Sequence, residues 1–209
     1  SAEEIVAKRM AAPRRVEYKE TPLNIAPRGL VILVNFTDVV FKTDKAEMDS
    51  MLTGKNYTRD YSYTYRGKTY NITSEGSARQ YFEDASFGQY NPQFDVIGPV
   101  TISNNMSYYG ENDSYGSDMY PDKMVSEACK LADTEFDVDF TQYDNNNDNK
   151  VDFVFVIYAG YGEADGGGDN TIWPHAWNLY RAAGIRCEVD GKVVDLYACG
   201  NEMDNYTKH

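Results

Sequence analysis

Five residues spaced two apart carry groups that could bind a metal cation: Asp144, Asn146, Asp148, Lys150 and Asp152. In calcium loops of the helix-loop-helix type, alternating positions supply oxygen ligands, and the fourth of these uses its backbone carbonyl. Lys150 takes that fourth place, where its side chain is irrelevant, and Asp152 takes the fifth. The spacing therefore predicts a structural Ca²⁺ site at these five residues.

This loop departs from the usual calcium loop at two positions. The sharp turn is normally made by Gly, and here Asn149 occupies it, the non-Gly residue that best tolerates left-handed backbone. The final bidentate Glu is replaced by Phe155, which belongs to an apolar strand-like run. The sequence therefore indicates a truncated calcium loop that feeds a strand. A simple polar turn rich in Asn and Asp is the alternative.

A second acidic segment follows the strand-like run. Its glycine-rich sequence contains Glu163, Asp165 and Asp169 but lacks the Lys-Ser/Thr pair of a phosphate-binding loop. Carboxylates would also repel phosphate. Two interpretations stay open, a second cation site and a flexible acidic loop.

His175 lies between Trp173 and Trp177 and is one of only two histidines. A Ser or Cys nucleophile would need this histidine as its base, together with an orienting acid. The sequence does not place such an acid. A packed histidine that hydrogen-bonds to backbone is therefore the favoured interpretation, with a catalytic role as the alternative.

Composition excludes several classes of partner. The chain has 209 residues and a net charge of −13, which disfavours nucleic acids and anionic membranes as partners. No apolar run approaches the ~20 residues of a membrane span. A calcium loop is typical of a calcium-rich compartment, so we expect a secreted or cell-surface protein. The sequence does not indicate an oligomeric state.

The three cysteines do not form a disulfide framework. Cys187 and Cys199 flank a predicted hairpin that turns at Asp190-Gly191. In that register Cys187 lies opposite Val194, which leaves Cys199 roughly 17 Å away. This separation exceeds the reach of a disulfide, so the sequence predicts free thiols.

Strands and helices alternate along most of the chain. The sequence predicts strands at 29–36, 94–102 and 151–159, helices at 44–52, 77–88 and 121–132, and hairpins at 57–72 and around 190–191. Thr43 is the expected cap of the first helix, and residues 103–118 are expected to form a long loop. Gly98-Pro99 indicates an edge strand or a bulge.

This order predicts an α/β (α+β) fold, a single domain with a twisted mixed sheet and flanking helices. Residues 1–27 are expected to form an N-terminal arm or linker with one short helix at 2–10. Residues 28–209 are expected to form the domain.

Several segments, taken in order, resemble the secreted bacterial metallopeptidases of the immune inhibitor A family. They are RGLVILVNFTD (28–38), SARQYFEDASFG (77–88), FDVIGPV (94–100), DFTQYDNNNDNKVDFVFVIYAGYGEADGGG (139–168) and IWPHAW (172–177). The resemblance covers roughly residues 28–200 and implies the N-terminal part of a zincin-like catalytic domain. It also implies protein or peptide substrates.

The resemblance fails at the zinc site. Members of that family are zinc endopeptidases in which a His-Glu-x-x-His helix binds the metal. Neither His175 nor His209 begins such a motif. The resemblance therefore implies Zn²⁺ only for a longer catalytic domain, and it assigns no catalytic residue here.

Three hypotheses follow for function. The first is a portion of a secreted zinc endopeptidase with a structural calcium loop. The second is a non-catalytic module that kept the sheet and the calcium loop. The third is a calcium-stabilised module that binds carbohydrate through its many aromatic side chains. Under the first hypothesis, Lys192–Cys199 is the candidate edge strand that would pair with an extended substrate; an ordinary strand paired on both sides is the alternative.

Overall fold

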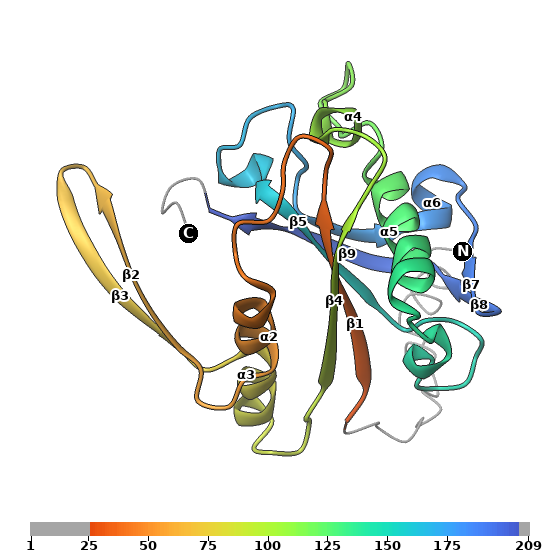
Figure 1. Cartoon of the computed structure of the whole chain (residues 1–209), viewed down its shortest axis with the longest axis horizontal. Helices are drawn as coiled ribbons and strands as arrows, with labels where there is room; N and C mark the ends of the chain where they lie inside the picture. Colours follow the sequence, from red (N-terminus) through yellow and green to blue (C-terminus); the bar gives the residue numbers. More distant parts are fainter. Residues whose placement is uncertain (1–25, 205–209) are drawn as a thin grey trace, which may run out of the picture.

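The computed structural model describes residues 26–204, which form a five-stranded mixed sheet with helices on both faces (Figure 1). The strand order is β4-β1-β5-β9-β6. The strands are β1 (Arg28–Asn35), β4 (Gln93–Thr101), β5 (Val154–Tyr161), β6 (His175–Asn178) and β9 (Leu196–Met203). The first four strands in this order run parallel to their neighbours, and β6 is antiparallel to β9. The predicted mixed α/β sheet is confirmed.

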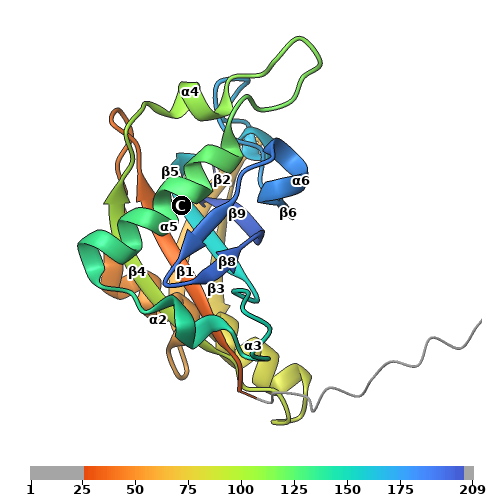
Figure 2. The ribbon, with the colours of Figure 1, turned by 90° about the vertical axis from the view of Figure 1, so that its right-hand side faces the viewer.

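The central strand β1 is apolar along its length because both of its faces are buried. Leu30, Ile32 and Val34 belong to the larger core, beneath α5 (Pro121–Phe136). Figure 2 shows α5 lying across this face of the sheet. Val31 and Leu33 belong to a smaller core on the opposite face, where they pack with Met48 of α2 (Lys45–Thr53).

Local capping sets where two of the helices begin. The cap of α2 is Asp44, whose carboxylate accepts the N–H of Ala46 at 2.7 Å, so the prediction of Thr43 is wrong by one residue. The helix α3 (Ala78–Ala85) is capped by Ser77, whose hydroxyl accepts the N–H of Gln80 at 3.1 Å. A side-chain oxygen two or three residues before these donors satisfies N–H groups that no helical carbonyl can reach.

Two further boundaries differ from the expectations. The helix α5 begins at Pro121 as predicted but continues to Phe136, one turn beyond Ala132. The expected long loop at 103–118 contains a short helix, α4 (Met106–Gly110), because Asn105 caps it and Met106 is buried. The strand β4 lies at a sheet edge and shifts register near Gly98-Pro99, so both features predicted there are confirmed.

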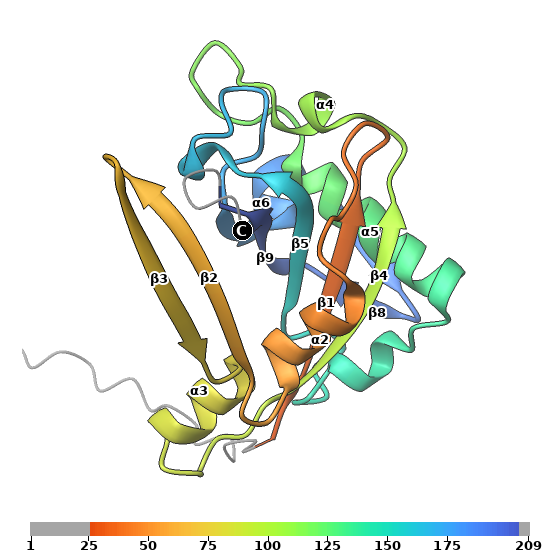
Figure 3. The same cartoon turned by 60° about the vertical axis from the view of Figure 1, so that its left-hand side comes forward.

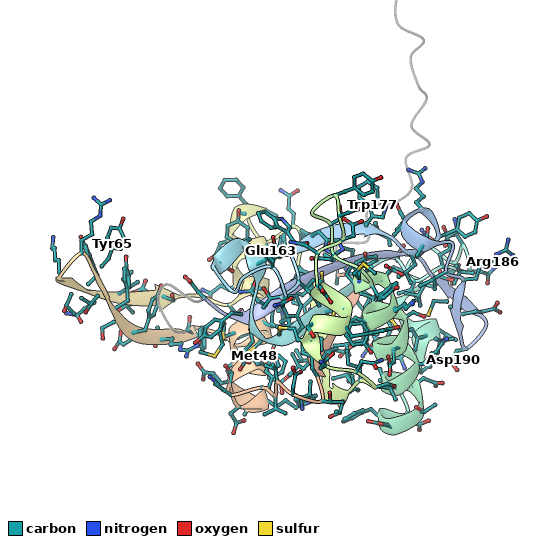
Figure 4. The ribbon with its side chains drawn as sticks, turned by 90° about the horizontal axis from the view of Figure 1, so that it is seen from above. Met48, Tyr65, Glu163, Trp177, Arg186 and Asp190 are labelled. Carbon is teal, nitrogen blue, oxygen red and sulfur yellow. The ribbon has the colours of Figure 1, made fainter. Side chains whose placement is uncertain are left out.

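Two hairpins lie outside the main sheet. The strands β2 (Thr58–Tyr65) and β3 (Lys68–Glu75) form an arm that stands away from the sheet (Figure 3), with Tyr65 at its outer end (Figure 4). The strands β7 (Cys187–Val189) and β8 (Lys192–Val194) pair with Cys187 opposite Val194, as predicted. All three cysteines are buried, and none of them is in a disulfide in this structure.

The expected arm at 1–27, with its helix at 2–10, falls almost wholly outside the described residues. Three short helices complete the part that is described: the 3₁₀ segments η1 (Phe140–Tyr143) and η2 (Glu163–Asp165), and α6 (Leu179–Ala183). Within residues 26–204, no helix is long and apolar enough to cross a membrane.

Candidate functional site: the cation loop and the His175 cluster

The predicted calcium ligands all lie in one loop between η1 and β5, and residues Asp144–Asp152 are called the cation loop below. Its ends are held together because the N–H of Asp152 donates to the carbonyl of Tyr143 at 3.0 Å. Asn149 has a φ of 67°, the left-handed backbone expected at the sharp turn. The strand β5 begins at Val154, three residues later than the predicted Val151, because the loop occupies that stretch.

Asp144 is the most enclosed acid of the cation loop. Its side chain is 1% exposed and accepts the N–H groups of Asp148 at 2.9 Å and Asn149 at 3.0 Å. The ammonium of Lys192, on β8, lies 2.7 Å from the same carboxylate. The hydrogen bond from Lys192 is the main cause that lowers the pKa of Asp144, and the two N–H donors add to it. Asp144 is therefore a carboxylate whose charge the chain itself compensates.

The other predicted ligands are also engaged within the loop. Asn146 accepts the N–H of Asp148, and Asp148 accepts the N–H of Lys150, both at 2.9 Å. The carboxylate of Asp152 accepts the backbone and side-chain N–H groups of Asn145 at 2.7 and 2.8 Å. The loop is thus shaped by short-range bonds from N–H groups to side-chain oxygens.

Two residues that the sequence analysis did not single out connect the cation loop to the fold. Asn145 accepts the N–H of Arg28 at 2.8 Å and donates to its carbonyl at 3.0 Å, which joins the loop to β1. On the other side, Val193 exchanges backbone hydrogen bonds with Val151 and Asn149, each at 3.0 Å. The alternating polar pattern could not reveal Lys192, because it lies 48 residues from Asp144.

The donor set of the cation loop suits calcium in chemical type. Ca²⁺ takes carboxylate, amide and carbonyl oxygens, and the loop carries all three. In the geometry observed, however, these oxygens accept hydrogen bonds, and no three His, Cys, Asp or Glu side chains within residues 26–204 gather as a metal site would require. The positive charge beside the Asp144 carboxylate is instead supplied by the ammonium of Lys192, at 2.7 Å.

A second polar group lies where β6 meets β9, and we call Asp118, Asp122, His175, Tyr197 and Cys199 the His175 cluster. The Nδ1 of His175 lies 2.6 Å from the carbonyl of Trp173, and its Nε2 lies 2.9 Å from the Tyr197 hydroxyl. Since a carbonyl only accepts, Nδ1 carries a proton and donates to Trp173, and Nε2 hydrogen-bonds to the Tyr197 hydroxyl. The backbone hydrogen bond expected for a packed histidine is present.

The thiol of Cys199 lies 3.4 Å from Nδ1 of His175 but is unsuited to nucleophilic attack. Burial raises the pKa of Cys199 to about 12, so the thiolate is scarce near neutral pH.

The two acids of the cluster carry buried oxygens that lack a hydrogen-bond partner within the described residues: one oxygen of Asp118 and one of Asp122. The other Asp118 oxygen accepts the N–H of Trp173 at 2.9 Å, which fixes the segment leading into β6. Burial raises the pKa of Asp118 to about 6 against the lowering effect of that N–H, and nearby Glu163 raises it further. Burial also raises the pKa of Asp122.

The acids of the glycine-rich segment do not gather as a group of three metal-binding side chains within residues 26–204. Glu163 accepts from the side chain of Asn112 at 3.2 Å, Asp165 accepts from that of Asn201 at 2.7 Å, and Asp169 is exposed. Burial is the main cause that raises the pKa of Tyr158, and Asp165 and Glu163 both lie close enough to Tyr158 to raise it further.

The candidate edge strand Lys192–Cys199 is wrong, and the alternative of strands already paired within the fold is correct. Residues 192–194 pair with β7, and β9 lies between β5 and β6, so Lys192–Cys199 is already paired within the fold. The edge of the sheet on this side is β6, the short antiparallel strand that contains His175 and Trp177. The sequence analysis missed β6 as a strand because it has only four residues and follows a proline.

The sequence that forms this mixed sheet matches a family of peptidases. Residues 22–208 match the model of the immune inhibitor A peptidase M6 catalytic domain. The chain therefore belongs to the peptidase M6 family. It is 29% identical over 178 residues to immune inhibitor A of Bacillus thuringiensis subsp. alesti, which covers 72% of this chain and 25% of that relative. The chain thus spans about a quarter of the length of the relative.

Peptidases of this family are metallopeptidases, which act on protein or peptide substrates with a metal such as zinc. The described residues do not fit zinc. Their sole histidine, His175, uses both ring nitrogens in hydrogen bonds, and residues 26–204 hold no set of three metal-binding side chains.

Proposed function

We propose that this chain forms the sheet-bearing portion of a secreted zinc-dependent endopeptidase, with a zincin-like arrangement at 28–209 and an N-terminal arm at 1–27. The observation that carries the proposal is the match to the M6 catalytic domain across nearly the whole chain. The zinc ligands and the general base lie outside the described residues. Peptide hydrolysis is accordingly the activity of a longer protein, and this portion contributes substrate binding and structural support.

Substrate binding is assigned to β6. Its inner side pairs with β9, and it ends the sheet, so its outer backbone edge can accept an extended peptide as a further strand. The neighbouring side chains Trp173 and Trp177 are 52% and 55% exposed, and they can cover the apolar side chains of such a peptide. The hydrogen bonds of His175 and Asp118 hold this segment in place.

The cation loop is assigned a structural role. Its oxygens suit Ca²⁺, and binding would require the Lys192 ammonium to move away from Asp144. The loop then fixes the start of β5, which lies in the middle of the sheet. Calcium thus acts on the stability of the domain and not on the reaction.

The test uses casein peptides and hydrogen exchange. The purified chain of 209 residues is expected to bind an extended casein peptide weakly, to protect the amides of 175–178, and to leave the peptide uncut. Trp177→Ala is expected to weaken binding about five- to tenfold, the size of one lost aromatic contact. Phe136→Ala, which removes another exposed aromatic ring far from β6, serves as the control.

Cleavage of casein by this chain, blocked by a zinc chelator, would show that the zinc site lies within it and would overturn the assignment. Binding of oligosaccharides in place of peptides would favour the alternative, a non-catalytic module. One observation supports that alternative: the rings of Tyr63 and Tyr70 stack with their centroids 5.3 Å apart on the arm, and such aromatic rings can pack against sugars.

A further inference from the structure

Two of the three cysteines come together in the larger core, although they lie far apart in the sequence. Cys129 is on α5 and is 0% exposed, and Cys187 begins β7 and is 1% exposed. The expectation from sequence compared Cys187 only with Cys199, so this pairing was missed.

Several contacts place Cys187 against α5. Its thiol donates to the carbonyl of Ser126 at 4.0 Å, and Ser126 lies one helical turn before Cys129. The ionisation of each of the two thiols is also influenced by the other, which makes Cys129 and Cys187 neighbours in the core. The third thiol, Cys199, instead lies beside His175.

We propose that Cys129 and Cys187 are the site of a disulfide that joins α5 to β7 in an oxidising compartment. The bond would enclose the cation loop, β5 and β6 in one covalent ring. A ring of this length removes much conformational freedom from the unfolded chain. The disulfide is independent of the peptidase assignment, but it does require that the chain meets an oxidant.

The chemistry is a thiol–disulfide exchange with a small-molecule disulfide such as oxidised glutathione. The thiolate of Cys187 attacks one glutathione sulfur, and the released glutathione thiolate takes up the proton that Cys187 lost. Cys129 then loses its proton and attacks the Cys187 sulfur, which releases the second glutathione. Two protein thiols are oxidised, and one disulfide is reduced to two thiols.

The order of attack follows from the opposite effects that the two thiols have on each other. The neighbouring Cys129 thiol lowers the pKa of Cys187, whereas Cys187 and burial raise the pKa of Cys129, so Cys187 is the better first nucleophile. Because both sulfurs are buried in the folded chain, we expect exchange late in folding, when α5 and β7 already bring the two thiols together but do not yet exclude glutathione. Once formed, the bond is shielded from reductants.

The test is refolding of the 209-residue chain in a mixture of oxidised and reduced glutathione. We expect an intact mass about 2 Da lower than that of the fully reduced chain, one titratable thiol in denaturant in place of three, and a linked peptide that contains Cys129 and Cys187. We expect the chain refolded in the reducing agent dithiothreitol to melt on the order of 5–15 °C below the chain refolded in the glutathione mixture.

Two variants sharpen the test. Cys199→Ala is expected to keep the mass decrease and to lose the remaining thiol, whereas Cys129→Ala is expected to show no mass decrease and no effect of the reductant on melting. Three free thiols after oxidative refolding to the native circular dichroism spectrum would overturn the proposal. A bond that includes Cys199, or a bond between two chains, would also overturn it.

Discussion

The cation loop and the His175 cluster both contain acids beside the same sheet, but the pKa is lowered for the enclosed acid of the loop and raised for the two acids of the cluster. In the cation loop, Asp144 receives two N–H groups and the Lys192 ammonium, and its pKa is lowered. In the His175 cluster, Asp118 and Asp122 each bury an oxygen without a partner in the described part of the chain, and their pKa values are raised.

The contrast shows that acidic composition alone does not define a metal site. Where the chain supplies its own donors, a carboxylate remains charged and holds a loop in shape. Where burial dominates, a carboxylate is driven toward its neutral form. The first region should therefore respond to changes in charge, and the second should respond to pH.

The largest expected effect comes from the cation loop. Asp144→Ala removes the partner of Lys192 and the acceptor of two backbone N–H groups, so the loop loses the bonds that shape it. We expect the largest fall in melting temperature of this series, by several degrees, measured by circular dichroism. Asp169→Ala is the control, because it removes an exposed acid from the other acidic segment. Equal effects of the two variants would end the distinction between the regions.

Lys192→Met tests whether the ammonium and calcium serve the same carboxylate. The change leaves Asp144 without its counter-charge, so we expect a lower melting temperature in chelator and a larger recovery on addition of Ca²⁺ than in the wild type. Thermal melts with and without calcium measure the difference. Lys150→Met is the matched control, since the loop is expected to use only the Lys150 carbonyl. An identical calcium response in all three proteins would argue against a cation in this loop.

The His175 cluster is tested by pH. Because burial raises the pKa of Asp118 to about 6, the folded chain keeps this proton over a range in which the unfolded chain has lost it. The free energy of unfolding should therefore fall as the pH rises from about 4 to about 6, by roughly 1–2 kcal/mol after solvent screening. Asp118→Asn should abolish this fall.

Urea unfolding at several pH values measures the effect of Asp118→Asn, and Glu135→Gln on the exposed end of α5 is the control. The variant is expected to be more stable than the wild type near neutral pH and about equally stable at low pH. A variant with an unchanged pH dependence would show that Asp118 is not the responsible group.

The smallest expected effect comes from the pair His175 and Tyr197. Tyr197→Phe removes their 2.9 Å hydrogen bond and should cost about 1 kcal/mol of stability. His175→Phe removes the same bond and one more, to the Trp173 carbonyl, so the double variant should cost less than the two single changes together. Urea unfolding of the three variants measures this coupling, and strict additivity would exclude it.

The sequence predicted most of the sheet because each long strand carries a local signal. The near-continuous apolar run at 29–36 can only be buried on both faces, and the Arg66-Gly67 and Asp190-Gly191 turns indicate their hairpins directly. In the cation loop, the alternating oxygens and the left-handed Asn149 are likewise local features.

What the sequence could not show depends on contacts between distant residues. Lys192 reaches Asp144, and Cys187 reaches Cys129, only after the chain has folded. The sequence left open whether β9 lies inside the sheet or at its edge for the same reason, since the partner that covers it is the four-residue strand β6. Short strands without an alternating pattern give little signal of their own.

The most direct measurement is the metal content of the purified 209-residue chain, determined by elemental mass spectrometry after exposure to calcium and zinc and removal of loosely bound ions. The account predicts about one calcium and no zinc per chain, with calcium lost in Asp144→Ala. Stoichiometric zinc that is lost in His175→Phe would contradict the account, because the His175 cluster would then be the metal site and the cation loop only a turn.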